Sequence, residues 1–64
     1  MKINRQKLML LMASKSFSLL ELSKNSGISA TTICRMQRGN NCKPATIGKI
    51  AKALDCDVKE LLED

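Results

Sequence analysis

The chain has 64 residues, which suffices for one small domain. It carries 11 Lys and Arg against 6 Asp and Glu, a formal charge of +5, and it contains no His, Tyr or Trp. The lack of His removes the most frequent general base and metal ligand, so the composition argues against an enzyme. The single aromatic residue, Phe17, also argues against a single-strand binder, because such proteins stack bases on several aromatic rings.

Apolar residues recur at helical spacing along almost the whole chain, and no segment alternates in the manner of a strand. The first expected helix runs from Asn4, its N-cap, to about Ala13. The second begins at Ser18, because Ser18 and Glu21 have the spacing of a capping box. Gly27 is expected to end it, since glycine readily adopts the positive φ of a tight turn.

The third expected helix is capped by Ser29, covers residues 30–38 and ends at Gly39. Its apolar residues Ile33 and Met36 point to one side. Polar side chains three to four residues apart share the other side: Thr31, Arg35 and Arg38.

Pro44 suits the first turn of a fourth helix. The apolar stripe of this helix consists of Ile47, Ile50, Ala51 and Leu54. Gly48 in its interior costs about 1 kcal/mol relative to Ala, which a close helix–helix crossing would explain. Asp57 and Glu60 then have the spacing of a second capping box and predict a fifth helix. The sequence therefore predicts an all-α, five-helix domain over residues 1–64.

The charge is unevenly distributed along the chain. Residues 1–54 hold ten Lys and Arg against one Glu, a net +9, whereas residues 55–64 hold five acids against one Lys, a net −4. A body this basic favours a polyanionic partner, with nucleic acid first and an anionic membrane second. An ordinary solvated surface is the plainer alternative.

Cys34, Cys42 and Cys56 are separated by eight and fourteen positions and form no C-x-x-C pair. With no His to complete a ligand set, we expect no metal site and no cofactor. An odd number of cysteines cannot form a complete disulfide framework, so reduced thiols are expected, with a redox-sensing Cys34 as the alternative.

The apolar run from Leu8 to Met12 is too short for a signal peptide and far short of the ~20 residues that span a bilayer. We therefore expect a soluble, cytoplasmic protein without a membrane partner. Lys2, Arg5 and Lys7 leave open a basic amphipathic helix lying on a membrane, but the apolar face of that helix is needed for the core.

Residues 18–39 have the length of a helix-turn-helix, with capping serines and glycines at the expected helix ends. Several short stretches in a fixed order carry a wider resemblance: Phe17-Ser18, Glu21-Leu22, Gly27-Ile28-Ser29, Thr32 to Gly39, Ile50 to Leu54, and Val58 with Glu60-Leu61-Leu62. Together they resemble the lambda-repressor-like (Cro/CI-type) domains of bacterial and phage regulators. The resemblance covers essentially the whole chain.

The resemblance implies a sequence-specific regulator, most simply a repressor, that binds double-stranded DNA with residues 30–38 in the major groove. It implies base contacts from Ala30, Thr31 and Arg35. Arg35 suits a bidentate contact with guanine, and the methyl groups of Ala30 and Thr31 suit thymine. It also implies a bacterial, phage or mobile-element protein that is nucleoid-associated when bound. We expect no small-molecule ligand, because the sequence shows no ligand or sensor domain.

The free N–H groups at the start of the second helix suit a phosphate, and the resemblance implies further phosphate contacts after the third helix. The expected residues are Ser18, Leu19, Arg38, Asn40, Asn41 and Lys43. For the loop residues, an ordinary polar loop is the alternative.

The sequence departs from the family pattern at three places. Leu19 replaces a common Gln, so a phosphate contact is lost or replaced, and Leu19 is either exposed or part of an interface. Met12 and Gln37 together replace a common Arg–Glu pair, which we interpret as a neutral substitute. Asp55 stands where Gly is usual, so a slightly strained turn is expected.

One recognition helix per chain favours a homodimer on a palindromic operator. The expected dimer interface consists of Val58, Leu61 and Leu62, although Leu61 and Leu62 could serve only the core. The alternative function is a protein-interaction module, such as an antitoxin or a mobile-element accessory factor, with Leu19 and the acidic end as the partner surface.

Overall fold

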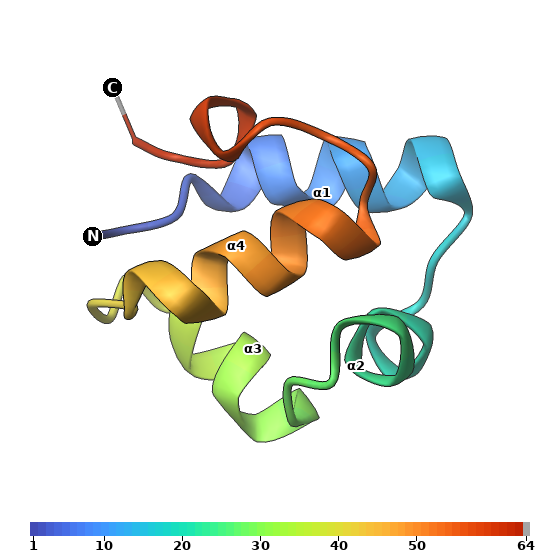
Figure 1. Cartoon of the computed structure of the whole chain (residues 1–64), viewed down its shortest axis with the longest axis horizontal. Coiled ribbons are helices and arrows are strands. Elements are labelled where there is room, and N and C mark those ends of the chain that lie inside the picture. The colour runs from blue at the N-terminus through green and yellow to red at the C-terminus, as the bar shows by residue number, and fades with distance from the viewer. Residues whose placement is uncertain (64) are drawn as a thin grey trace.

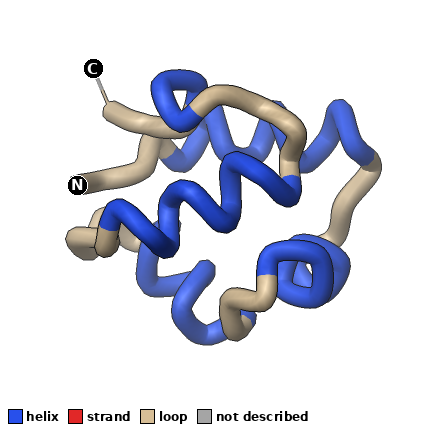
Figure 2. The backbone as a smooth tube through the Cα atoms, viewed as in Figure 1, coloured by secondary structure: helices blue, strands red, loops and turns tan. Residues whose placement is uncertain are grey.

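A computed structural model describes residues 1–63, and these form an all-helical domain (Figures 1 and 2). The elements are the α-helices α1 (Arg5–Lys15), α2 (Leu19–Ser26), α3 (Ala30–Gln37) and α4 (Pro44–Ala53), followed by the 3-10 helix η1 (Val58–Glu60). In Figure 1, α4 crosses the middle of the molecule, with α1 on one side of it and α2 and α3 on the other.

The expected helix caps are confirmed. The Asn4 side chain accepts a hydrogen bond from the Lys7 amide at 3.0 Å and starts α1, which runs two residues beyond the expected end. The Ser18 hydroxyl accepts from the Glu21 amide at 3.2 Å, and the Glu21 carboxylate accepts from the Ser18 amide at 3.1 Å. Gly27 ends α2 with a φ of 74°.

The expected fifth α-helix is instead the three-residue 3-10 helix η1. The Glu60 carboxylate does accept from the Asp57 amide at 3.0 Å, as the capping box requires. The backbone beyond it, however, is committed elsewhere, because the Leu61 carbonyl accepts from the Asn4 amide and Ile3 pairs with Leu62 in an antiparallel bridge. These bonds hold the chain extended after η1 and stop the helix from continuing.

The core is aliphatic and contains the predicted apolar stripe of α4. The fully buried side chains are those of Leu8, Leu22, Ile33, Ile47, Ile50, Leu54 and Leu61. Every element of the described chain contributes to this cluster, either with a buried residue or with a partly buried one such as Val58. The position of α3 relative to the rest of the domain is therefore fixed by packing.

Two turn-related expectations have different outcomes. Asp55 has a φ of 52°, in the left-handed region that favours glycine, as expected from its place after α4. The close helix–helix crossing considered for Gly48 is absent, because a Cβ atom at Gly48 would meet nothing within 4 Å. Within this chain, packing does not require glycine at that position.

Both ends of the described chain meet beside the α3–α4 loop. The Asn4 amide donates to the Leu61 carbonyl at 2.6 Å, and the Glu63 amide donates to the Lys2 carbonyl at 3.2 Å. The Cys42 amide in the loop donates to the Met1 carbonyl at 2.6 Å. No helix within residues 1–63 is long and apolar enough to cross a membrane.

Candidate nucleic-acid interface

Two serine side chains of α2 hold the turn between α2 and α3 through hydrogen bonds with Ile28. The Ser23 hydroxyl donates to the Ile28 carbonyl at 2.7 Å, and the Ile28 amide donates to the Ser26 hydroxyl at 3.2 Å. The Ile28 side chain packs against the core. The turn therefore fixes the direction in which α3 leaves α2, as a helix-turn-helix requires.

The buried and exposed faces of α3 are sharply separated. Ile33 is fully buried and Met36 is 2% exposed, so this side of the helix is anchored in the core. Thr31 and Arg35 are exposed on the outer side, and Ala30 is half-buried. The three base-contact candidates are thus carried by a helix anchored in the core, with Thr31 and Arg35 exposed to solvent.

A groove runs along α3 next to the loop that leads into α4. Its walls come from the α2–α3 turn, α3, the loop and the first turns of α4: Gly27, Ile28, Ser29, Thr32, Arg35, Met36, Asn40, Asn41, Cys42, Lys43 and Thr46. The groove therefore brings Arg35 together with three expected phosphate contacts, Asn40, Asn41 and Lys43. Thr32 and Thr46 also line it and were not predicted, although Thr32 lies three residues before Arg35 on one side of α3.

The start of α2 differs from the expectation in two respects. The Ser18 amide is already bonded to the Glu21 carboxylate, so the amides left for a phosphate are those of Leu19 and Leu20, with the Ser18 hydroxyl as a further donor. Leu19 is half-buried against the core and does not form an exposed patch. The exposed residue is Leu20, at 72%.

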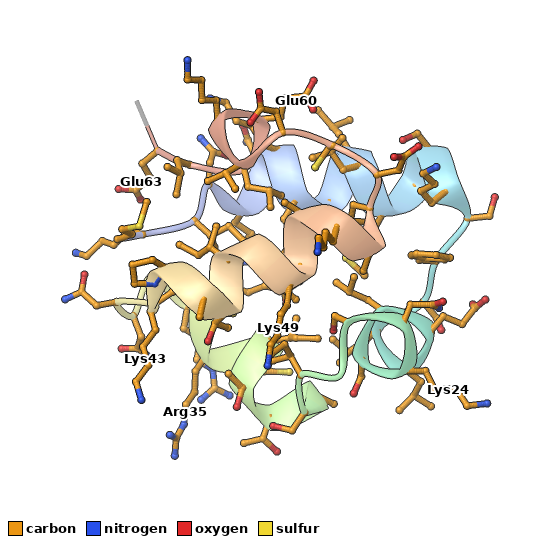
Figure 3. All side chains as sticks on the ribbon, viewed as in Figure 1. Lys24, Arg35, Lys43, Lys49, Glu60 and Glu63 are labelled. Atoms are coloured by element: carbon orange, nitrogen blue, oxygen red, sulfur yellow. The ribbon has the colours of Figure 1, made fainter. Side chains whose placement is uncertain are left out.

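Charge is separated in space as well as in sequence. In Figure 3, Arg35 and Lys43 project from one side of the molecule, whereas Glu60 and Glu63 lie on the opposite side. Within residues 1–63, Lys15 Nζ and Asp55 Oδ2 lie 3.7 Å apart and form an exposed ion pair. An exposed pair of this kind contributes little to stability.

The sequence matches the profile of the Cro/C1-type HTH DNA-binding domain over residues 7–64. The chain belongs to this family. No curated protein matches the chain by sequence. The all-helical fold and the helix-turn-helix agree with that assignment, so the domain is of a type that binds DNA and regulates transcription.

Solved structures of two proteins resemble this Cro/C1-type domain. The restriction-modification controller protein C.AhdI from Aeromonas hydrophila has a TM-score of 0.79 and 32% identity, and the match covers 88% of this chain and 86% of that one. The structure of native PhpD with cadmium atoms has a TM-score of 0.86 and 22% identity to this chain. In complex with cadmium and hydroethylphosphonate its TM-score is 0.85. The chain spans only 14% of the length of PhpD, so this likeness concerns the fold alone.

The Cro/C1-type domain keeps its interior uncharged at the positions where the family commonly has an Arg–Glu pair. Met12 and Gln37 are both half-buried. No buried side-chain nitrogen or oxygen within the described chain lacks a hydrogen-bond partner. Losing both charged residues together therefore leaves no orphaned group, as the interpretation of a neutral substitute requires.

The cysteines of the domain are all free. Burial raises the pKa of the Cys42 thiol above its usual value. Burial also raises the pKa of Cys56, and the carboxylates of Glu60, Asp57 and Asp55 add to this effect. Between residues 1 and 63, no group of His, Cys, Asp or Glu is arranged to hold a metal ion.

The residues expected at a dimer interface differ in exposure. Leu61 is fully buried in the core of the single chain. Val58 and Leu62 are half-buried and pack against that core. A contact with a second copy at this edge would therefore depend on Val58 and Leu62, with Leu61 supporting them from inside.

Proposed function

We propose that this Cro/C1-type domain is a sequence-specific regulator of transcription, acting as a repressor on double-stranded DNA with α3 in the major groove. The observation that carries the proposal is the exposed pair Thr31 and Arg35 on a helix whose opposite face, Ile33 and Met36, is buried. A helix anchored in this way presents its outer side chains to base edges without rearrangement.

Arg35 is the strongest candidate for reading a base. Its guanidinium fork matches the O6 and N7 acceptors of guanine, and it makes no ion pair within the described chain that would have to be broken. The Thr31 hydroxyl and methyl suit a base edge or a thymine methyl. Ala30 offers only a small apolar contact, and its half-burial limits it further.

Phosphate contacts on either side of α3 would fix its depth and register in the groove. Asn40, Asn41 and Lys43 stand beside Arg35 around the groove, and Arg38 is exposed at the end of α3. On the other side, the Ser18 hydroxyl and the Leu19 amide lie at the start of α2, where a helix N-terminus favours an anion.

Two copies on a palindromic operator complete the proposal. One α3 per chain covers one half-site, and two-fold pairing doubles the contact area. Val58 and Leu62 are the surface offered to a second copy. Sedimentation of the free protein and of its DNA complex tests this part, because a 1:1 complex on a palindromic duplex would contradict it. The proposal also places the protein on the nucleoid, in the cytoplasm of a bacterium.

A second candidate function is a protein-interaction module, and one observation favours it. Large apolar side chains are exposed outside the α3 region: Met9 at 52%, Leu10 at 71% and Leu20 at 72%. In the partner surface expected from Leu19 and the acidic end, these residues take the place of Leu19, because Leu19 is half-buried against the core. Exposed apolar side chains favour contact with a protein over contact with DNA.

Binding to random-sequence duplex DNA, followed by fluorescence anisotropy as a function of salt, separates the two functions. A DNA-binding regulator loses affinity steeply as the salt concentration rises, because each phosphate contact releases counterions. The absence of binding at low salt would contradict the proposal and favour the interaction module.

A further inference from the structure

The cations on the side of α3 extend beyond α3 and its loop. In Figure 3, four labelled basic side chains project toward the side opposite to Glu60 and Glu63: Lys24, Arg35, Lys43 and Lys49. Lys24 belongs to α2 and Lys49 to α4, the helices that precede and follow α3 in the chain. Neither belongs to the surface that the sequence assigns to DNA.

These four cations are exposed and have no carboxylate partner among residues 1–63. Two other cations of the domain are engaged: Lys15 pairs with Asp55 at 3.7 Å, and Lys7 donates to the Leu62 carbonyl at 3.2 Å. Soluble surfaces usually intersperse charges of both signs. A side that gathers four unpaired cations, with Glu60 and Glu63 on the opposite side, is complementary to a polyanion.

Lys49 is the more informative of the two additional residues. Lys24 lies in the last turn of α2, where a cation also compensates the helix dipole. Lys49 lies in the middle of α4, where no helix end explains it, and it is exposed outside the apolar stripe that α4 buries in the core. Figure 3 shows its side chain directed toward α3.

We propose that Lys24 and Lys49 bind DNA phosphates outside the major-groove contact. The DNA backbone is then contacted by α2 and α4 in addition to the α3–α4 loop. This inference rests on the proposed DNA-binding function. The domain measures 24 Å along its longest axis, which matches about seven base pairs of duplex at roughly 3.4 Å each. A duplex of that length carries enough phosphates for two further lysines.

The test is the salt dependence of binding to random duplex DNA for Lys24→Gln and Lys49→Gln, with Lys59→Gln as the matched control. Each variant removes one positive charge from an exposed position, and Lys59 lies in η1 beside Glu60. We expect the slope of log K against log salt to fall by about 0.9 for Lys24→Gln and for Lys49→Gln. Lys59→Gln should keep the wild-type slope. Lys24→Arg and Lys49→Arg should keep it too, because each retains the positive charge.

The outcomes separate this inference from the function on which it rests. A wild-type protein with a steep slope, whose Lys24→Gln and Lys49→Gln variants behave like Lys59→Gln, would overturn the inference and leave the DNA-binding function in place. A wild-type protein that does not bind duplex DNA at low salt would overturn both. Gln has nearly the helix propensity of Lys, so circular dichroism should show folded variants throughout.

Discussion

The Ser29 hydroxyl accepts a hydrogen bond from the Thr32 amide at 3.2 Å and lies 2.9 Å from the Thr32 hydroxyl. The residue that caps α3 is thus tied to the first turn of the same helix twice. Thr31 and Arg35 take their positions from this turn, so the cap connects the stability of α3 to the geometry of its outer face.

Replacing Ser29 by Ala removes the cap and should lower the free energy of unfolding by about 1 kcal/mol. Urea denaturation followed by circular dichroism measures this loss. Ser14→Ala is the matched control, because the Ser14 hydroxyl only donates to the Leu11 carbonyl on an exposed part of α1. Equal losses in the two variants would show that the Ser29 cap has no special weight.

Gly48→Ala should stabilise the domain by about 1 kcal/mol, since the helix interior favours Ala and the new Cβ atom meets nothing within 4 Å. Gly27→Ala should have the opposite effect, because Gly27 has a φ of 74° that Ala adopts only with strain. Thermal unfolding of both variants gives the comparison. A destabilised Gly48→Ala variant would indicate that a contact outside the single chain requires glycine at this position.

The free energy of unfolding should fall as the pH rises past about 9. The reason is that folding raises the pKa of the Cys42 and Cys56 thiols above the usual 9.0. The folded protein holds the thiol protons more tightly than the unfolded chain, so this contribution is present below the usual pKa and is lost as the pH rises through the folded pKa. Chemical unfolding under reducing conditions measures it. In Cys56→Ser the fall should be shallower, and an unchanged pH profile would contradict the assignment.

Arg35→Ala should cost about 1–3 kcal/mol of binding free energy on the cognate site and little on random DNA. Lys43→Ala, its neighbour around the groove, should weaken both to a similar degree, because phosphates carry no sequence information. Titration of both variants on both duplexes gives the four binding free energies that the comparison requires. If Arg35→Ala weakened the two duplexes equally, Arg35 would be a phosphate contact.

The sequence predicts the four α-helices well because capping residues next to each end determine where the helix starts or stops. Asn4, Ser18 and Ser29 each accept a hydrogen bond from a backbone amide three residues further on, as their positions predict. The buried stripe of α4 also follows directly from its spacing. Caps and periodicity are properties of a few neighbouring residues, which sequence reasoning handles reliably.

Features that depend on distant residues were harder to predict. The capping box of Asp57 predicts a helix, but the bonds from Leu61 and Leu62 back to residues 3 and 4 end it after one turn. Leu19 packs against the core and Leu20 is exposed, an outcome set by the angle between α2 and its neighbours. The gathering of Lys24 and Lys49 on the side of Arg35 likewise depends on tertiary packing and has no local signal.

Selection of bound sites from a pool of random duplex DNA tests the central claim, that α3 of this Cro/C1-type domain reads base sequence, most directly. The account predicts enrichment of a palindromic sequence whose half-sites are centred about one helical turn apart. It also predicts a conserved guanine in each half-site that loses its enrichment with Arg35→Ala. Recovery of the starting pool without enrichment, from a protein that binds the duplex, would contradict it.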